Sequence, residues 1–240
     1  MSSHSSPNIT TNGLKICIDP ANNKSYPGTG LGVYDLSPVS GITYSIFEQA
    51  SWNTSNNGSF IFTTPIGNAT ASRVQSNTAQ NLNTAEMTID VWFKRTISNN
   101  TYNMVWSTFL PYLSFRSNNQ FLFSWTALDS TTLTQKTLYT NGIYSNNVWY
   151  NVCCTVTQDV TSGTSIGKIY VNGILENTSP TYTGVTQVRN TVNTFILGNW
   201  NTPEYWPFVG NISCFKLYDR ILTDSEILNN FNALKSRFDL

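Results

Sequence analysis

Residues 198–208, Gly-Asn-Trp-Asn-Thr-Pro-Glu-Tyr-Trp-Pro-Phe, combine aromatic and polar side chains at a spacing suited to ligand binding. The rings of Trp200, Tyr205 and Trp206 can stack on the apolar face of a sugar or on a partner protein. Asn201 and Glu204 carry the amide and carboxylate groups that hydrogen-bond to hydroxyls. We therefore predict a ligand-binding surface in this segment.

A structural role competes with this interpretation. Trp206 and Phe208 would serve equally well to close one end of a hydrophobic core, where large aromatic residues are common. Trp52, in the segment Ala-Ser-Trp-Asn at 50–53, is a second candidate binding residue with the same two interpretations. The sequence alone leaves both open.

Catalytic chemistry finds little support in the sequence. Hydrolysis of a glycosidic bond requires two carboxyl groups about 5–10 Å apart. Glu86 and Asp90 are the only such pair on a predicted strand, and we interpret both as solvated, with Asp90 on the solvent-facing side. His4 is the single histidine and lies in a polar N-terminal arm, which excludes a His-based triad. We predict no catalytic residue and no enzyme activity.

The four cysteines show no metal-ligand spacing. Cys153 and Cys154 are neighbours on a predicted strand and should point to opposite faces. We expect four buried free thiols, and a disulfide between Cys17 or Cys214 and one of the neighbouring pair is the alternative. No metal site and no cofactor are predicted.

Charge is sparse and balanced, which restricts the class of partner. Thirteen basic residues face thirteen acidic ones, and only 11% of residues are charged, against about 25% in a typical domain. No basic run favours nucleic acid or an anionic membrane. No stretch approaches the roughly 20 apolar residues of a membrane span, and the polar residues 1–12 lack the apolar core of a signal peptide. We expect synthesis in a cytoplasm without membrane insertion.

Periodicity predicts many short strands and one helix. Strands are expected at 14–18, 59–62, 87–95, 109–115, 120–125, 147–157, 167–171, 194–197 and 208–220. Residues 87–95 alternate between apolar and polar types, the pattern of a half-buried strand. Asn172-Gly173 is a hairpin turn. The helix should begin with a capping box from Thr223 to Glu226, and its apolar face should contain Ile227, Leu228, Phe231 and Leu234.

These elements predict an all-β fold. We expect a two-sheet antiparallel jelly-roll sandwich with one short C-terminal helix. Residues 14–240 should form a single domain, preceded by an N-terminal arm at 1–13 that is rich in Ser, Asn and Thr.

Three segments together resemble the concanavalin A-like lectin/glucanase domains, of the laminin-G-like kind, found in bacteriophage and other viral structural proteins. The first is Gly-Leu-Lys-Ile-Cys-Ile-Asp-Pro-Ala-Asn at 13–22, with Lys-Ser-Tyr-Pro-Gly-Thr-Gly at 24–30. The second is Met-Thr-Ile-Asp-Val-Trp-Phe-Lys at 87–94, followed by Asn-Val-Trp-Tyr-Asn-Val at 147–152. The third combines Tyr-Val-Asn-Gly at 170–173, Phe-Val-Gly-Asn-Ile at 208–212 and Leu-Thr-Asp-Ser-Glu-Ile at 222–227.

The resemblance implies a non-enzymatic virion structural protein on the particle exterior, as a capsid decoration or as an appendage of the tail or baseplate. Its arm would contact other capsid or tail proteins, the protein would form a homo-oligomer, and host-surface glycans are a further expected ligand. A soluble carbohydrate-binding lectin and, less in keeping with the residues, a polysaccharide depolymerase are the alternatives. Members of this family often carry an acidic, calcium-associated turn where this chain has residues 63–69, which contain no carboxylate.

Overall fold

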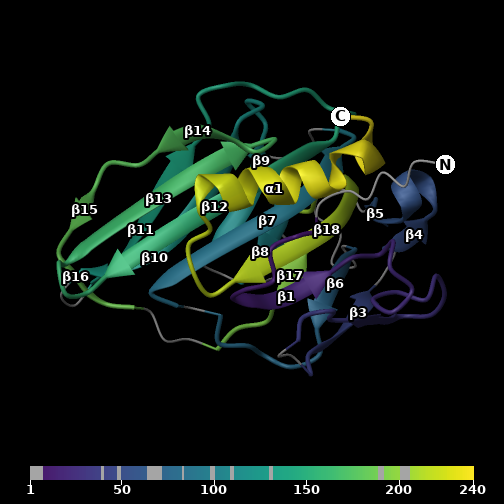
Figure 1. Cartoon of the computed structure of the whole chain (residues 1–240), viewed down its shortest axis with the longest axis horizontal. Helices are drawn as coiled ribbons and strands as arrows, with labels where there is room; N and C mark the ends of the chain where they lie inside the picture. Colours follow the sequence, from purple (N-terminus) through teal and green to yellow (C-terminus); the bar gives the residue numbers. More distant parts are fainter. Residues whose placement is uncertain are drawn as a thin grey trace.

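The computed structural model of the chain describes residues 8–38, 41–47, 50–63, 72–82, 84–97, 101–108, 111–129, 132–188, 192–200 and 206–240. These residues form two antiparallel sheets that pack face to face as a sandwich (Figure 1). The predicted fold class, an all-β jelly roll of two sheets with one C-terminal helix, is confirmed. No helix in the described part of the chain is long and apolar enough to cross a membrane.

The first sheet has the strand order β14-β13-β12-β7-β18-β5-β4, with β1 added beside β18 and β15 beside β13. Its central strands are long, and β18 joins β7 on one side to β1 and β5 on the other. The strands are β1 (Leu14–Ile18), β4 (Ser51–Asn53), β5 (Ser59–Phe62), β7 (Glu86–Arg95), β12 (Tyr150–Asp159), β13 (Thr164–Val171), β14 (Ile174–Thr178), β15 (Tyr182–Thr183) and β18 (Gly210–Tyr218).

The second sheet has the order β11-β10-β9-β8-β17-β6-β3-β2, with β16 added beside β10. Its strands are β2 (Gly32–Tyr34), β3 (Thr43–Phe47), β6 (Arg73–Ser76), β8 (Tyr102–Ser107), β9 (Tyr112–Arg116), β10 (Phe121–Asp129), β11 (Thr132–Tyr139), β16 (Val185–Gln187) and β17 (Ile196–Leu197). A short 3-10 helix at Ser55–Asn57 lies between β4 and β5, and the chain ends in α1 (Asp224–Leu234) followed by a 3-10 turn at Lys235–Phe238.

The main hydrophobic core fills the space between the two sheets. It consists of the inward-facing side chains of both, and aromatic rings dominate it. Phe93 of the first sheet, for example, meets Phe121 of the second edge to face at 5.3 Å, a favoured aromatic geometry. The side chains that face this core alternate along the strands with outward-facing ones, as the period-two patterns predict for such a sandwich.

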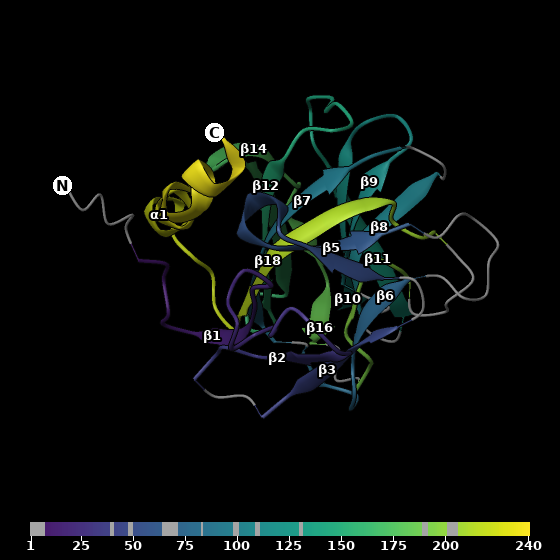
Figure 2. The same cartoon turned by 90° about the vertical axis from the view of Figure 1, so that its right-hand side faces the viewer.

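Strand β7 departs from the sequence prediction, because both of its faces are buried. Met87, Ile89, Val91 and Phe93 point into the core as predicted, but Thr88, Asp90 and Trp92 are buried as well. The reason is α1, which lies across the outer face of the first sheet over β12, β7 and β18 (Figures 1 and 2). Trp92 stacks on Phe238 at 4.1 Å and on Phe231 at 5.6 Å.

Helix α1 begins as predicted and presents a slightly different face. Thr223 accepts a hydrogen bond from the backbone N–H of Glu226, whose side chain accepts one from the backbone of Thr223, so the capping box is confirmed. Ile227 is buried, and Phe231 packs beneath the helix. Leu228 is 44% exposed, so its placement on the apolar face was wrong.

The described part of the N-terminal arm runs along α1 (Figure 2). The amide of Thr10 donates to Asn230 Oδ1 at 2.7 Å, and Tyr218 Oη donates to the carbonyl of Thr10 at 3.0 Å. Asn229 donates to the carbonyl of Asn8 at 2.8 Å. Residues 8–12 are thus bound to their own domain, while residues 1–7 lie outside the described part of the chain.

Candidate functional site

The outer face of the second sheet carries a cluster of aromatic side chains together with one arginine, which we call the aromatic face: Tyr102, Tyr112, Tyr139, Trp200 and Trp206, with Arg116. Its position follows from strand register. Met104, Ser114 and Leu122 are cross-strand neighbours on β8, β9 and β10, and they form its floor. The alternate residues, such as Leu113 and Phe121, point into the core.

The rings form a continuous series over this floor. Tyr112 meets Trp200 edge to face at 4.9 Å, Trp200 meets Trp206 at 5.4 Å, and Trp206 meets Tyr102 at 4.8 Å. Tyr112 is buried, whereas Tyr102 and both tryptophans are half-buried. The series therefore presents accessible aromatic edges and faces in a fixed arrangement.

The connection between β17 and β18 brings the two tryptophans onto the sheet. Gly198 has a φ of 82° and lies so close to Phe62 that an added Cβ would be 2.3 Å from that ring, so glycine is required here. The amide of Gly198 donates to the carbonyl of Val105 at 3.0 Å, and the amide of Met104 donates to the carbonyl of Trp206 at 3.0 Å. Both ends of the connection are thereby tied to β8.

Trp206 adopts a backbone conformation that is unusual for its residue type. Its φ is 58°, and the other non-glycine residues with positive φ in the described part of the chain are asparagines and one aspartate. A bulky residue in the left-handed region is uncommon, and such strain costs about 1–3 kcal/mol. Despite this cost, the backbone keeps the conformation that places the Trp206 ring over β8.

Polar groups accompany the rings. The Arg116 guanidinium lies 4.1 Å from the centre of the Tyr102 ring, a cation–π arrangement. Gln135 Nε2 donates to Tyr112 Oη and to Ser124 Oγ, both at 2.9 Å. Burial raises the pKa of Tyr112, so its hydroxyl keeps its proton at neutral pH. The face thus combines ring surfaces with amide, hydroxyl and guanidinium groups.

Three buried polar atoms of this region have no hydrogen-bond partner among the described residues. They are Ser114 Oγ in the floor, Arg116 Nε at its edge and Thr126 Oγ1 further along β10. A buried polar atom without a partner is costly and is found in native proteins where a water or a ligand completes it.

The structure brings together only part of the predicted binding segment. Trp200 and Trp206 lie in the aromatic face, whereas Asn201, Glu204 and Tyr205 lie outside the described residues. The alternative that Trp206 closes the core is wrong, because its ring lies outside the second sheet. Phe208 does have that role, meeting Phe93 at 6.0 Å within the core.

Trp52 belongs to the first sheet, at the edge strand β4. Its indole N–H donates to the carbonyl of Pro20 at 3.0 Å, and its ring lies 5.9 Å from Tyr26. Together with Pro27 and Gly28 these residues line a cavity of about 260 Å³. Trp52 therefore forms a separate aromatic pocket and does not join Trp200 and Trp206.

A further cavity, of about 540 Å³, is lined by residues of β1, of the end of β18 and of the segment 80–84. The ion pair between Lys15 and Asp219, 2.9 Å long, lies in its wall. Leu82 and Leu217 supply an apolar side. Some of its lining residues belong to the hydrophobic core, and none of the described lining residues is aromatic.

Asp90 is buried, and its predicted solvent exposure was wrong. The carboxylate forms a 2.8 Å ion pair with Lys216 Nζ and accepts from Asn151 Nδ2 at 2.6 Å and from Asn230 Nδ2 at 3.3 Å. Burial alone lowers the pKa of Lys216, but the charge of Asp90 more than offsets this, so that the pKa is raised well above its usual value. Glu86, by contrast, is exposed, so the two carboxylates do not form a catalytic pair.

The cysteines are free and buried, as predicted. Cys154 faces the core and Cys153 faces α1, which confirms their opposite orientation. Burial raises the pKa of the Cys153 and Cys154 thiols, so both remain protonated and unreactive. Among the described residues, no three His, Cys, Asp or Glu side chains gather as metal ligands, and the acidic-turn position at 63–69 lies largely outside them.

Sequence reasoning missed Tyr102, Tyr112, Arg116 and Gln135. A signal was present for two of them, because the alternation Tyr-Leu-Ser-Phe-Arg at 112–116 places Tyr112 and Arg116 opposite the core residues of β9. Strands β8 and β11 were not predicted, so the outward positions of Tyr102 and Gln135 had no basis in the sequence pattern.

Comparison with known families assigns the fold to a superfamily. The profile of the concanavalin A-like lectin/glucanases superfamily matches residues 68–228, about two thirds of the chain. The chain belongs to this superfamily. No curated protein matches the sequence.

Solved structures share the fold at low sequence identity. The receptor-binding domain of botulinum neurotoxin type G is 14% identical over 92% of this chain and 51% of that one, with a TM-score of 0.64. The binding domain of botulinum neurotoxin DC in complex with SialylT is 14% identical over 93% and 52%, also at 0.64. A structure of type C, whose cell entry depends on two ganglioside molecules, is 15% identical over 92% and 51%, at 0.62. The chain spans about half the length of these structures, and the fold is lectin-like.

Proposed function

We propose that this protein is a non-enzymatic carbohydrate-binding module on the exterior of a virus particle, where it contacts host-surface glycans. The aromatic face carries the proposal. It offers half-buried indole and phenol rings beside amide, hydroxyl and guanidinium groups, which is the combination that stacks on a sugar ring and hydrogen-bonds its hydroxyls.

Two features support binding at this face. Trp206 is held in a strained backbone conformation, and strain of this kind clusters at ligand-binding positions. The unpartnered hydroxyl of Ser114 lies in the floor of the same face. The superfamily is named for lectins, and the toxin domains of similar fold include one in complex with SialylT and one whose cell entry depends on gangliosides.

The placement of the carboxylates supports a binding function over hydrolysis. Asp90 is neutralised by Lys216 beneath α1, so it cannot act as an acid or a nucleophile on a sugar at the surface. A depolymerase would release reducing sugar from a host polysaccharide and would lose this activity on Glu86→Gln or Glu204→Gln. We expect no release from the unmodified protein.

The virion setting rests on the sequence resemblance of residues 13–37 to phage structural proteins. It is tested by mass spectrometry and immunogold labelling of purified particles from the source virus. Regular labelling over the capsid would support a decoration protein, and labelling at the tail would support a host-attachment appendage. Absence from the particle would contradict the virion role and leave a soluble lectin.

Carbohydrate binding is tested on a glycan array with the full chain and with Trp206→Ala. We expect a defined set of glycans to bind and the signal to fall by roughly tenfold or more in the variant, because stacking on one ring contributes about 1–2 kcal/mol. Trp149→Ala is the matched control, since Trp149 lies under α1 beside Phe238. Equal loss in both variants, or no binding to any glycan, would contradict the proposal.

A further inference from the structure

Arg116 stands out among the polar groups of the aromatic face, because its charge has no carboxylate partner among the residues that the structure describes. Its guanidinium lies over the Tyr102 ring at 4.1 Å and 5.7 Å from the centre of the Tyr139 ring. Its one side-chain hydrogen bond among the described residues, from Nη1 to Tyr139 Oη, is long at 3.4 Å. The buried Nε has no partner among the described residues.

Two other half-buried arginines of the described chain, Arg220 and Arg237, are paired with carboxylates. Arg220 forms a bidentate pair with Glu226, at 2.5 and 2.9 Å, and Arg237 pairs with Asp19 at 2.8 Å. The one carboxylate on the hairpin beside β11, Glu176, accepts from the amide of Gly142 at 2.6 Å. Among the described residues, Arg116 therefore keeps most of its donor capacity unused.

A second arginine lies directly beneath it. Arg95 is fully buried, and its Nη1 donates to the backbone carbonyl of Arg116 at 2.7 Å. Its remaining acceptors are also neutral, namely Asn146 Oδ1 at 2.6 Å and Asn119 Oδ1 at 2.5 Å. Burial lowers the pKa of Arg95 to about 10, so the guanidinium is still charged at neutral pH.

The two arginines produce a local concentration of positive charge in a chain that is neutral as a whole. No carboxylate among the described residues compensates either of them, and the buried position of Arg95 places its charge in a medium of low dielectric constant, where its field is weakly screened. Tyr102 connects this charge to the tryptophans, because its ring contacts both Arg116 and Trp206.

We infer that the aromatic face selects anionic glycans, with the Arg116 guanidinium binding a carboxylate or sulfate of the sugar while Trp206 and Trp200 stack on its rings. This inference rests on the proposed carbohydrate-binding function and adds the chemical class of the ligand. Guanidinium presents a planar pair of donors that matches carboxylate and sulfate oxygens. The anionic group of the ligand would accept hydrogen bonds from the unused donors of Arg116.

The experiment compares matched anionic and neutral probes on the full-length protein. Three pairs are used: sialyllactose and lactose, tetragalacturonate and its methyl ester, and a heparin fragment and its desulfated form. We expect measurable binding to at least one anionic member and at least roughly tenfold weaker binding to its neutral counterpart, because hydrogen bonds to charged groups contribute about 1.5–3 kcal/mol. The carboxylated and sulfated arms distinguish the two sources of negative charge.

Substitution then assigns the effect to Arg116. Arg116→Gln should abolish the preference for the anionic member and leave the remaining affinity equal to that for the neutral one. Arg116→Lys should restore the preference only in part, since an ammonium lacks the bidentate geometry. Arg73→Gln is the matched control, because Arg73 also lies over an aromatic ring, that of Phe47 at 4.6 Å, on the same sheet.

The outcomes separate this inference from the proposed function. Binding of neutral glycans that depends on Trp206 but not on Arg116 would overturn the anionic selectivity while the carbohydrate-binding function stands. An Arg116→Gln variant that keeps the preference for the anionic probe would also overturn it. Failure of every probe and of the glycan array to bind would overturn both.

Discussion

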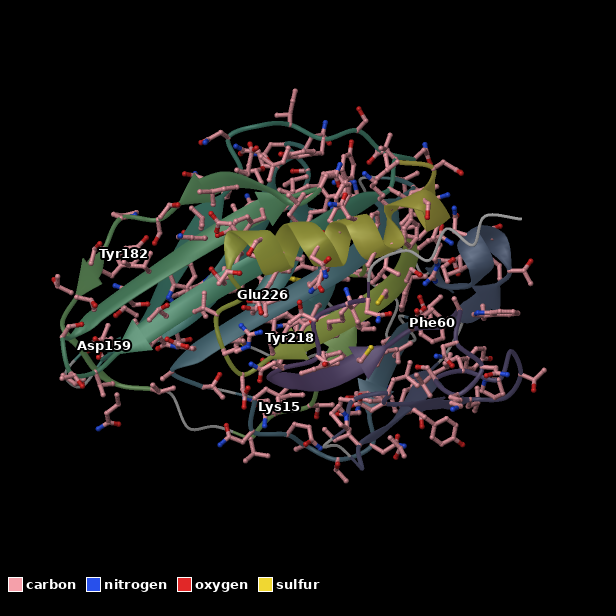
Figure 3. All side chains as sticks on the ribbon, viewed as in Figure 1. Lys15, Phe60, Asp159, Tyr182, Tyr218 and Glu226 are labelled. Carbon is pink, nitrogen blue, oxygen red and sulfur yellow. The ribbon has the colours of Figure 1, made fainter. Side chains whose placement is uncertain are left out.

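The outer faces of both sheets contain charged residues and tryptophans. On the first sheet these side chains are paired and covered by a helix, whereas on the second sheet they are partly exposed. On the first sheet, Asp90 and Lys216 are paired at 2.8 Å under α1, and Trp92 is stacked between helix and sheet. On the second sheet, Arg116 has no carboxylate partner within the described part of the chain, and Trp206 is half-buried in a strained conformation. We call the outer face of the first sheet, covered by α1, the closed face. Figure 3 shows Tyr218 on this face, beneath the helix that carries Glu226. The chain covers one face with its own helix, and we propose that a ligand covers the other.

The largest expected effect comes from breaking the ion pair of the closed face. Asp90→Ala would leave the Lys216 ammonium buried without a counter-charge, and the free energy of unfolding should fall by about 3–5 kcal/mol in urea denaturation. Asp219→Ala is the matched control, because it removes the partner of the surface residue Lys15, and should cost less than about 1 kcal/mol. Equal losses would contradict the view that the closed face is a structural unit.

Substitution of one tryptophan on each outer face, Trp92 and Trp206, compares the two faces with the same residue type. Trp92→Ala should lower the free energy of unfolding by about 3–5 kcal/mol, because it creates a cavity beneath α1. Trp206→Ala should cost about 1–2 kcal/mol, because its ring is only half-buried. The order should reverse for glycan binding, which Trp206→Ala weakens by roughly tenfold or more and Trp92→Ala preserves in the folded fraction. If the Trp206→Ala variant unfolds, the aromatic face stabilises the fold as the closed face does, and the comparison is contradicted.

Alkaline pH should reduce the stabilisation that the Asp90–Lys216 ion pair of the closed face provides. The pKa of Lys216 is raised above its ordinary value of 10.5. The stabilisation from its proton is therefore complete below that value and is lost as the pH rises towards the folded pKa. The double variant Asp90→Leu/Lys216→Met lacks this group, so its unfolding free energy should fall less as the pH rises above 10.5. Identical slopes for both proteins would contradict the pairing.

The smallest effect is expected at the start of α1. Hydrogen bonds from Arg220 lower the pKa of Glu226 to about 2. Its contribution is present above the ordinary value of 4.5 and is lost as the pH falls towards about 2. Glu226→Gln should cost less than about 1 kcal/mol at neutral pH and flatten the acid dependence of stability. Glu86→Gln, a change at an exposed position, should leave the acid dependence as it is.

The fold was accessible from the sequence where local patterns are strong. β1, β5, β7 and the capping box of α1 lie where alternation, turn residues and the Thr223–Glu226 spacing predicted them. Strand β11 was missed, because Thr, Gln and Lys occupy most of its positions and leave no clear period of two. Strand β3 alternates, but only over five residues. Val148 was placed in a strand but is exposed, since β12 begins at Tyr150.

The site was accessible only in part, because it depends on contacts between distant segments. Trp200 and Trp206 were identified from composition, but their neighbours Tyr102 and Tyr112 come from strands about a hundred residues earlier. Asp90 was misjudged for the same reason. Period two assigns it to an outer face, and only the position of α1, more than 130 residues later, shows that this face is covered.

The central claim is that the aromatic face is the ligand-binding surface. Hydrogen–deuterium exchange, with and without the strongest glycan from the array, tests it most directly. We predict slower exchange in peptides covering 102–116 and the two tryptophans, with no change over 224–238. Protection confined to α1 or to the pocket of Trp52 would contradict the claim.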